Sequence, residues 1–215
     1  MADNNEKEHK KGSLKSWQKV FVNRSLNMEH IKSIGFDMDH TLAIYNSATF
    51  EALAFEETLK KFIDAGYPKD LAKLKFDPDF LIRGLLVDRE RGNLLKVDGH
   101  KYVKTAYHGH QKLSKEERRK LYNQDSYVAE KLLSVDTLFA LSEVQLFIEI
   151  VDYMDANPEK IKKSYTEVYK DLRVFIDSAH RDGSIKNKVT ADIERYIIRD
   201  KYLVSTLVKL SDDGK

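Results

Sequence analysis

The segment Ile31-Lys-Ser-Ile-Gly-Phe-Asp-Met-Asp-His-Thr-Leu42 joins a short apolar run to two carboxylates. Residues 31–37 have the length and composition of a β-strand, and a helical pattern follows over residues 50–66. Gly66 and Pro68 are expected to end that helix, because glycine accepts a left-handed backbone and proline cannot continue a helix. A strand followed by a helix predicts the opening βα unit of an α/β fold.

A second pattern, of short apolar runs, fills the next part of the chain. The runs are Leu81–Asp88, Asn93–Asp98 and Lys101–Ala106. They are separated by Arg91-Gly92 and Asp98-Gly99, and both pairs favour turns. Alternation of short strands and tight turns predicts an antiparallel β meander.

After His110 the sequence is helical in pattern almost to its end. Ser114 with Glu117, and Ser142 with Gln145, have capping-box spacing. The pair Asn157-Pro158 is expected to open a long helix that runs to about Arg181 and ends at Gly183. Two shorter helices are predicted near residues 190–199 and 201–211.

The composition of the 215 residues restricts the class of protein. The absence of cysteine excludes disulfides and thiolate zinc sites. A net charge of +2 gives no reason to expect nucleic acid or a membrane as a partner, and no apolar run approaches the length of a membrane span. Residues 1–16 are polar and charged, which predicts a disordered arm without a signal core. We therefore expect a cytoplasmic protein with no nucleic-acid and no membrane partner.

The two carboxylates of the first segment are Asp37 and Asp39. Open α/β sheets bind ligands at the carboxyl ends of their strands, which is where both residues are expected. A carboxylate that attacks phosphorus needs a hard cation to offset charge repulsion, and Mg²⁺ with oxygen ligands meets that need. Asp37 is the predicted nucleophile and Asp39 the predicted acid/base, while Thr41 can donate to phosphate oxygens. The alternative is that the two aspartates only end a strand.

This string resembles motif I of the haloacid dehalogenase superfamily of phosphohydrolases. Four strings in order, Val20–Leu26, Gly35–Ala43, Arg83–Asp88 and Gly92–Asp98, resemble the cytosolic purine 5′-nucleotidase family, which prefers inosine and guanosine monophosphates. The resemblance runs from about residue 20 to the C-terminus. It implies a haloacid dehalogenase-like Rossmannoid core that begins in residues 17–66, and a largely helical cap with a small meander in residues 67–215.

The resemblance also implies specific chemistry. Asp37 is phosphorylated in that family and Asp39 is the acid/base. Mg²⁺ is held by the Asp37 carboxylate and by the backbone carbonyl of Asp39, so both are expected metal residues here. Homo-oligomers and an allosteric purine-nucleotide site are implied as well.

A second polar group lies on the predicted long helix. Arg173, Asp177 and His180 are spaced to share one face, beside a separate apolar stripe. An exposed ion pair with an exposed histidine would explain them equally. The resemblance instead implies that residues 177–186, including Lys186, contribute to nucleotide binding.

Phe139 matches an aromatic residue of the family that stacks on the base, although a core phenylalanine is also compatible with the sequence. The animal enzymes have a polar residue after this phenylalanine, whereas this chain has Ala140. That departure concerns the base preference rather than the phosphoryl chemistry.

Several elements of the superfamily were not found in the sequence. Between Asp98 and Lys215 there is no apolar strand ending in the Thr or Ser of the second motif, no matching lysine clamp and no later acidic pair. The chain is therefore expected to be an N-terminal segment with negligible activity alone. The predicted function is Mg²⁺-dependent hydrolysis of purine nucleoside 5′-monophosphates. A non-catalytic nucleotide-binding or interaction module, and a phosphatase for another phosphomonoester, are the alternatives.

Overall fold

The computed structural model describes Phe21, Asn23 and residues 27–123 and 132–215. These residues divide into two compact units, one with the residues up to Phe36 together with Tyr202–Lys215, the other with Asp37–Lys201. The predicted disordered arm, residues 1–16, lies outside the described residues. Within the described parts, none of the helices combines the length and apolar content needed to cross a bilayer.

The smaller unit contains helix α7, Leu203–Asp212, which confirms the helix predicted at residues 201–211. The chain turns after this helix, and the Lys215 ammonium donates to the carbonyl of Met28 over 2.8 Å.

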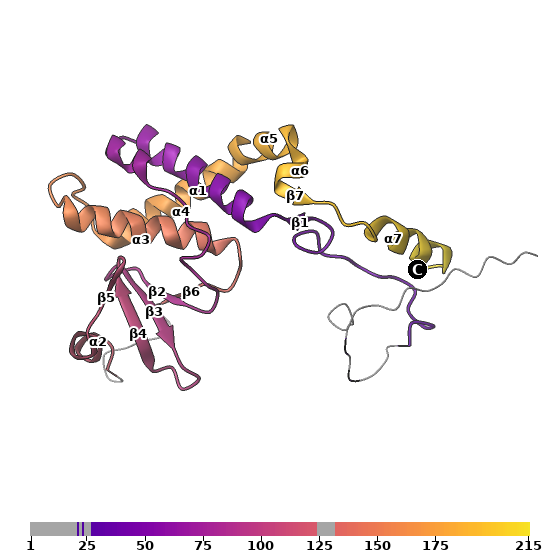
Figure 1. Ribbon diagram of the computed structural model, residues 1–215, viewed down its shortest axis with the longest axis horizontal. Coiled ribbons are helices and arrows are strands. Elements are labelled where there is room, and N and C mark those ends of the chain that lie inside the picture. Colours follow the sequence, from indigo (N-terminus) through magenta and orange to yellow (C-terminus); the bar gives the residue numbers. More distant parts are fainter. Residues whose placement is uncertain (1–20, 22, 24–26, 124–131) are drawn as a thin grey trace, which may run out of the picture. The chain divides into compact units, whose positions relative to one another are not determined.

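The larger unit contains a layer of three long helices, α1 (Ser47–Asp64), α3 (Ala140–Ala156) and α4 (Tyr165–Arg181). Helix α1 packs against both α3 and α4, and the layer lies on one side of a five-stranded sheet (Figure 1). The apolar core between helices and sheet includes fully buried side chains from all three helices, among them Phe55, Phe62, Phe147 and Leu172. This core holds the start of α3 and the end of α4 in place.

The sheet has the strand order β5-β4-β3-β2-β6, with every pair antiparallel. Its strands are β2 (Leu86–Asp88), β3 (Asn93–Val97), β4 (Val103–His108), β5 (Gln111–Lys112) and β6 (Leu133–Ser134). The predicted meander is confirmed, and Asp98 closes its second turn by accepting from the backbone N–H groups of His100 and Tyr102. The first strand is shorter than predicted, because only residues 86–88 of the run pair with β3.

Shorter elements complete the larger unit. These are β1 (Ile44–Tyr45), the 3-10 helix η2 (Lys69–Lys73), α2 (Lys115–Leu121), α5 (Ser184–Ala191), α6 (Ile193–Tyr196) and β7 (Ile197–Ile198). Strand β7 pairs with β1, so the helix predicted at 190–199 is interrupted at Asp192 and is wrong from residue 197 onward.

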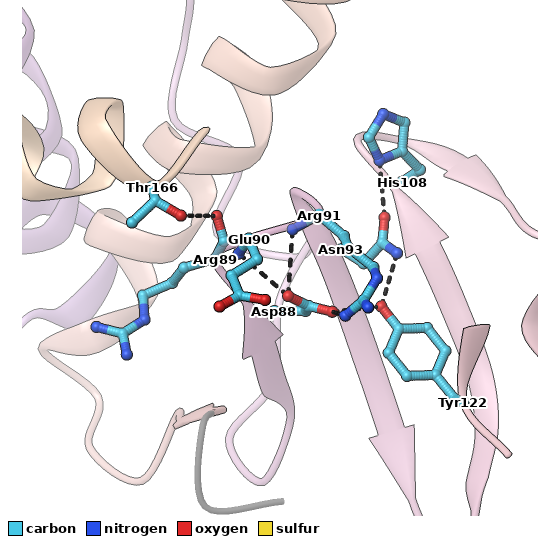
Figure 2. A network of polar contacts seen from close by, with 8 residues as sticks. All are labelled: Asp88, Arg89, Glu90, Arg91, Asn93, His108, Tyr122 and Thr166. Atoms are coloured by element: carbon cyan, nitrogen blue, oxygen red, sulfur yellow. Dashed lines mark hydrogen bonds and ion pairs between the residues drawn. The ribbon is translucent and has the colours of Figure 1, made fainter. Parts of the chain in front are cut away.

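A buried polar network supports the sheet (Figure 2). The Asp88 carboxylate is 2% exposed and accepts from the Tyr122 hydroxyl over 2.8 Å and from the Arg91 guanidinium over 3.0 Å. The Asn93 amide donates to the Tyr122 oxygen over 2.7 Å, and its own oxygen lies 2.7 Å from the His108 ring. Each buried polar group of the network therefore has a partner, as groups removed from water require.

The predicted strand at residues 31–37 is absent. These residues carry no strand assignment, and most of their side chains are exposed. A strand is stable only when its backbone N–H and C=O groups pair with a neighbour, and no described strand lies beside this segment. The Rossmannoid core that this strand was expected to open therefore remains a prediction.

Two of the predicted helix starts are wrong. Helix α3 begins at Ala140, so Ser142 lies inside it, and the Ser142 N–H donates to Glu51 over 3.3 Å. Asn157 ends α3 instead of opening α4. Helix α4 begins after Ser164, which forms a capping box with Glu167 and satisfies the N–H groups of the first turn.

Three predicted helix ends are confirmed. Ser114 and Glu117 form the expected capping box on α2. The backbone at Gly66 and Gly183 is left-handed, with φ of 90° and 89°, at the ends of α1 and α4.

Candidate functional site

The two predicted catalytic aspartates lie on a tight loop that ends at β1. The Met38 carbonyl accepts from the N–H groups of Leu42 over 3.0 Å and Ala43 over 2.8 Å, and the His40 N–H donates back to Ala43 over 2.8 Å. His40 takes a left-handed backbone with φ of 56°, a conformation that is uncommon for residues other than glycine. The loop makes a full turn, so that Ala43, just before β1, forms a parallel bridge with Asp39.

The Tyr45 hydroxyl contacts Asp39 directly. It donates to the Asp39 Oδ1 atom over 2.8 Å. Burial, together with the hydrogen bond and the negative charge of Asp39, raises the pKa of Tyr45 to about 12. The hydroxyl is therefore protonated at neutral pH and acts as a donor. Among the described residues, no hydrogen bond reaches Asp39 Oδ2, and no hydrogen bond or ion pair reaches the exposed Asp37 carboxylate.

Aromatic rings join this loop to the start of α3. The His40 ring lies 5.2 Å from both the Tyr45 and the Phe139 rings, measured between centroids. The Tyr45 ring also lies 5.7 Å from Phe139 and 4.7 Å from Phe50. The structure thus brings the predicted base-stacking residue next to the predicted catalytic loop, although they are separated by about a hundred residues of sequence.

The other predicted ligand residues occupy α4 and α5. The Arg173 guanidinium donates to Asp177 over 2.9 Å and also to Glu143 of α3. The ion-pair alternative for Arg173 and Asp177 is thus present in the structure, with Glu143 as an additional partner. No hydrogen bond or ion pair within the described residues links this group to the catalytic loop.

Within the described residues, no hydrogen bond, ion pair or ring contact joins His180 or Lys186 to the predicted catalytic loop, although residues adjacent to them in sequence pack near it. Ala179 packs in the same apolar cluster as Phe50, and Phe139 lies at the edge of that cluster. Partial burial lowers the pKa of His180, with a contribution from Arg173 that Asp177 opposes, so the imidazole is neutral at pH 7. Lys186 is exposed, as is Thr41.

Comparison with known proteins identifies the family. Residues 20–215 match the 5′ nucleotidase family. The chain belongs to that family. A 5′-nucleotidase domain-containing protein of Dictyostelium discoideum is 30% identical over 205 residues, which cover 92% of this chain and 34% of the relative. The human 5′-nucleotidase domain-containing protein 2 is 28% identical over 210 residues, which cover 91% of this chain and 40% of that protein. The chain thus spans less than half the length of either relative.

The 5′ nucleotidase family is typically metal-dependent, and the loop offers a partial donor set for a hard cation. The exposed Asp37 carboxylate and the Asp39 backbone carbonyl are oxygen donors free of other hydrogen bonds in the described residues. A site with only two protein oxygen donors is compatible with Mg²⁺, because this ion usually keeps several water ligands. No group of three or more His, Asp or Glu side chains in the described parts is arranged to hold a metal.

Sequence reasoning missed three residues of the candidate site. His40 and Tyr45 lie within and just after the motif, and their contacts depend on the full turn that the loop makes between Asp39 and Ala43. Glu143, which pairs with Arg173, is thirty residues away in sequence. In a single sequence, an aromatic residue four positions after Thr41 is weak evidence for a site residue. The contact of Tyr45 with Asp39 is seen only once the path of the loop is known.

Proposed function

We propose that the intact protein hydrolyses purine nucleoside 5′-monophosphates in an Mg²⁺-dependent reaction through an aspartyl-phosphate on Asp37. Family membership supports a phosphohydrolase. The proposal rests on two observations: the Asp37 carboxylate is exposed with no partner among the described residues, and its loop makes an aromatic contact with Phe139. The loop with Asp37 suits a phosphate, and the Phe139 ring suits a nucleotide base.

In the first half of the reaction, an Asp37 carboxylate oxygen attacks phosphorus and the bond from phosphorus to the 5′ oxygen breaks. Protonated Asp39 gives its proton to that leaving oxygen, which departs as the nucleoside hydroxyl. Thr41, which is exposed on the same loop, donates to the non-bridging phosphate oxygens.

In the second half, the Asp39 carboxylate takes a proton from water while the water oxygen attacks phosphorus. The acyl-phosphate bond breaks, which regenerates the Asp37 carboxylate and releases inorganic phosphate. Asp39 ends protonated, ready for the next substrate. The Asp37 carboxylate and the Asp39 carbonyl would hold Mg²⁺, which supplies positive charge opposite the transferring phosphoryl group.

Base recognition is assigned to Phe139 with the polar residues of α4 and α5. The Phe139 ring stacks on the purine, and Asp177 and His180 supply an acceptor and a neutral imidazole for its edge. Arg173 holds Asp177 in place, and exposed Lys186 contributes positive charge.

The whole reaction is proposed for the intact protein, in the cytoplasm and as a homo-oligomer. The 215 residues alone are expected to release little phosphate, because the second motif, the lysine clamp and the acidic pair of the superfamily were not found among them. Loss of one such donor typically costs about a hundredfold or more in rate.

The test replaces the nucleophile in the intact protein. Asp37→Asn is expected to lower the rate of phosphate release from inosine monophosphate, with Mg²⁺ present, by at least about a thousandfold, because the amide cannot form the aspartyl-phosphate. Asp64→Asn is the matched control, since Asp64 is also exposed, and its activity should equal that of the wild type. Normal turnover by Asp37→Asn would refute the mechanism. A wild-type protein that released no phosphate from any phosphomonoester would favour a non-catalytic nucleotide-binding or interaction module.

A further inference from the structure

The Tyr45 side chain is fixed by its surroundings before its hydroxyl is considered. Its ring contacts three other rings, those of His40, Phe50 and Phe139, at centroid distances of 5.2, 4.7 and 5.7 Å. Each contact is tilted or edge-on, which is the favoured geometry for aromatic pairs. The ring is therefore held from three sides, and the hydroxyl has one preferred position.

That position distinguishes the two oxygens of Asp39. Tyr45 donates its single proton to Oδ1 over 2.8 Å, whereas Oδ2 receives no hydrogen bond from the described residues. An oxygen that already accepts a proton at this distance is a poor site for a second one. A proton carried by Asp39 thus belongs on Oδ2.

We propose that Tyr45 is a positioning residue that orients the Asp39 carboxyl group so that Oδ2 carries the transferable proton. The inference rests on the proposed function of Asp39. In the first half-reaction the proton leaves Oδ2 for the 5′ oxygen of the departing nucleoside. In the second half Oδ2 takes a proton from the attacking water, while Tyr45 keeps its own proton throughout.

The same ring links this oxygen to the proposed base site. Tyr45 touches Phe139 directly and through His40. A purine stacked on Phe139 would press against the residues that hold the Asp39 side chain in place. The Asp39 carboxyl group is then oriented by the same aromatic cluster on which the purine stacks.

The variant Tyr45→Phe tests this role in the intact protein, because it keeps the ring and removes only the hydroxyl. With inosine monophosphate, kcat is expected to fall on the order of tenfold, a fraction of the full general acid–base contribution, with KM within about twofold. With p-nitrophenyl phosphate, the initial burst of p-nitrophenolate should keep its wild-type rate, since this stable anion leaves without a proton. The steady-state rate that follows should fall, because hydrolysis of the aspartyl-phosphate still needs Asp39.

A second tyrosine provides the matched control. Tyr165 also donates to an aspartate, Asp155, and burial with that carboxylate raises its pKa to about 12 as well. Tyr165→Phe should leave kcat on both substrates unchanged. Equal loss on both substrates, burst included, would show that Tyr45 only supports the fold and would overturn the inference.

Crystal structures of the intact wild type and Tyr45→Phe give a readout that is independent of activity. The wild-type Asp39 carboxyl should show one orientation with Oδ1 against the hydroxyl, and the variant should show several. A single, unchanged orientation in the variant would overturn the positioning role, whether or not the protein is active. Loss of activity in Asp37→Asn with wild-type behaviour in Tyr45→Phe would sink this inference and leave the proposed function standing.

Discussion

The carboxylates of the proposed catalytic loop and those of the helix-and-sheet core are the same chemical group in opposite situations. Asp37 and Asp39 are exposed, and from the part of the chain that the structure describes they together accept one side-chain hydrogen bond, from Tyr45. Asp88 and Glu143 are buried, and each accepts from a tyrosine hydroxyl and an arginine. A buried carboxylate must be paired to persist, so its oxygens are already committed. A carboxylate that binds substrate or metal has to keep its oxygens free.

The difference explains why acidic residues of the core are poor candidates for chemistry here. Glu143 is a residue of α3 and is buried between α3 and α4. Burial, together with the charge and hydrogen bond of Glu143, raises the pKa of Tyr169 on α4 well above its ordinary value. Arg173 compensates the charge of Glu143 and extends to Asp177. The ion pair therefore secures the packing of α4 on α3 and holds Asp177 at the edge of the proposed base site.

The largest stability effect is expected where a committed carboxylate is removed. Asp88→Ala should lower the free energy of unfolding by about 3 kcal/mol, because it removes a buried carboxylate that accepts from both the Tyr122 hydroxyl and the Arg91 guanidinium. Urea denaturation followed by circular dichroism would measure it. Asp64→Ala, at an exposed position, should cost less than about 0.5 kcal/mol. Equal values for the two variants would mean that the Asp88 network contributes nothing.

Measuring stability as a function of pH would distinguish two buried glutamates of α1, Glu57 and Glu51, whose pKa values are shifted in opposite directions. Burial acts to raise the pKa of Glu57, but the hydrogen bonds from Lys188 and Lys60 outweigh it and lower the pKa below its ordinary value. A lowered pKa in the folded state gives stability that is present above the unfolded value of about 4.3 and is lost as the pH falls through the folded value. Glu57→Gln should thus cost about 1 kcal/mol at pH 7 and progressively less below about pH 4.

Glu51 is the internal control with the opposite sign. Burial raises its pKa, and the hydrogen bond from the Ser142 backbone N–H only partly offsets this. The stability that Glu51 contributes relative to Glu51→Gln is therefore fully present below the unfolded pKa and is lost as the pH rises through the folded pKa. Urea midpoints should be measured for both variants from below about pH 4 to pH 7. Relative to wild type, the Glu57→Gln midpoint should fall as the pH rises, and the Glu51→Gln midpoint should rise. Parallel curves would show that the lysine pairs do not act on Glu57.

Features set by neighbouring residues were predictable from the sequence. The Asp98-Gly99 turn, the Ser114 capping box and the left-handed Gly183 depend on a few adjacent residues, and the structure has all of them. The start of α4 was misplaced because Asn157-Pro158 is also a good local start signal. The reciprocal hydrogen bonds of Ser164 and Glu167 form the helix start instead.

Features that need distant partners were not predictable. The strand expected at residues 31–37 has the right composition, but strand formation requires a neighbouring strand. The contact between Tyr45 and Asp39 depends on the tight turn of the loop at His40, whose positive φ is uncommon for residues other than glycine. The proposed catalytic loop was predicted from its string of residue types, whereas the partners that contact it became visible only in three dimensions.

The smallest expected effect is the stability change of Asp37→Asn, the variant with the largest expected effect on activity. The Asp37 carboxylate has no partner among the described residues, so its loss should change the free energy of unfolding by less than about 0.5 kcal/mol. A slight gain is the expected sign, because the change removes a charge close in sequence to Asp39. Urea denaturation of the same preparations used for the activity assay would measure it. A loss above about 1 kcal/mol would mean that Asp37 bonds to the protein itself, and the contrast between free and committed carboxylates would no longer hold.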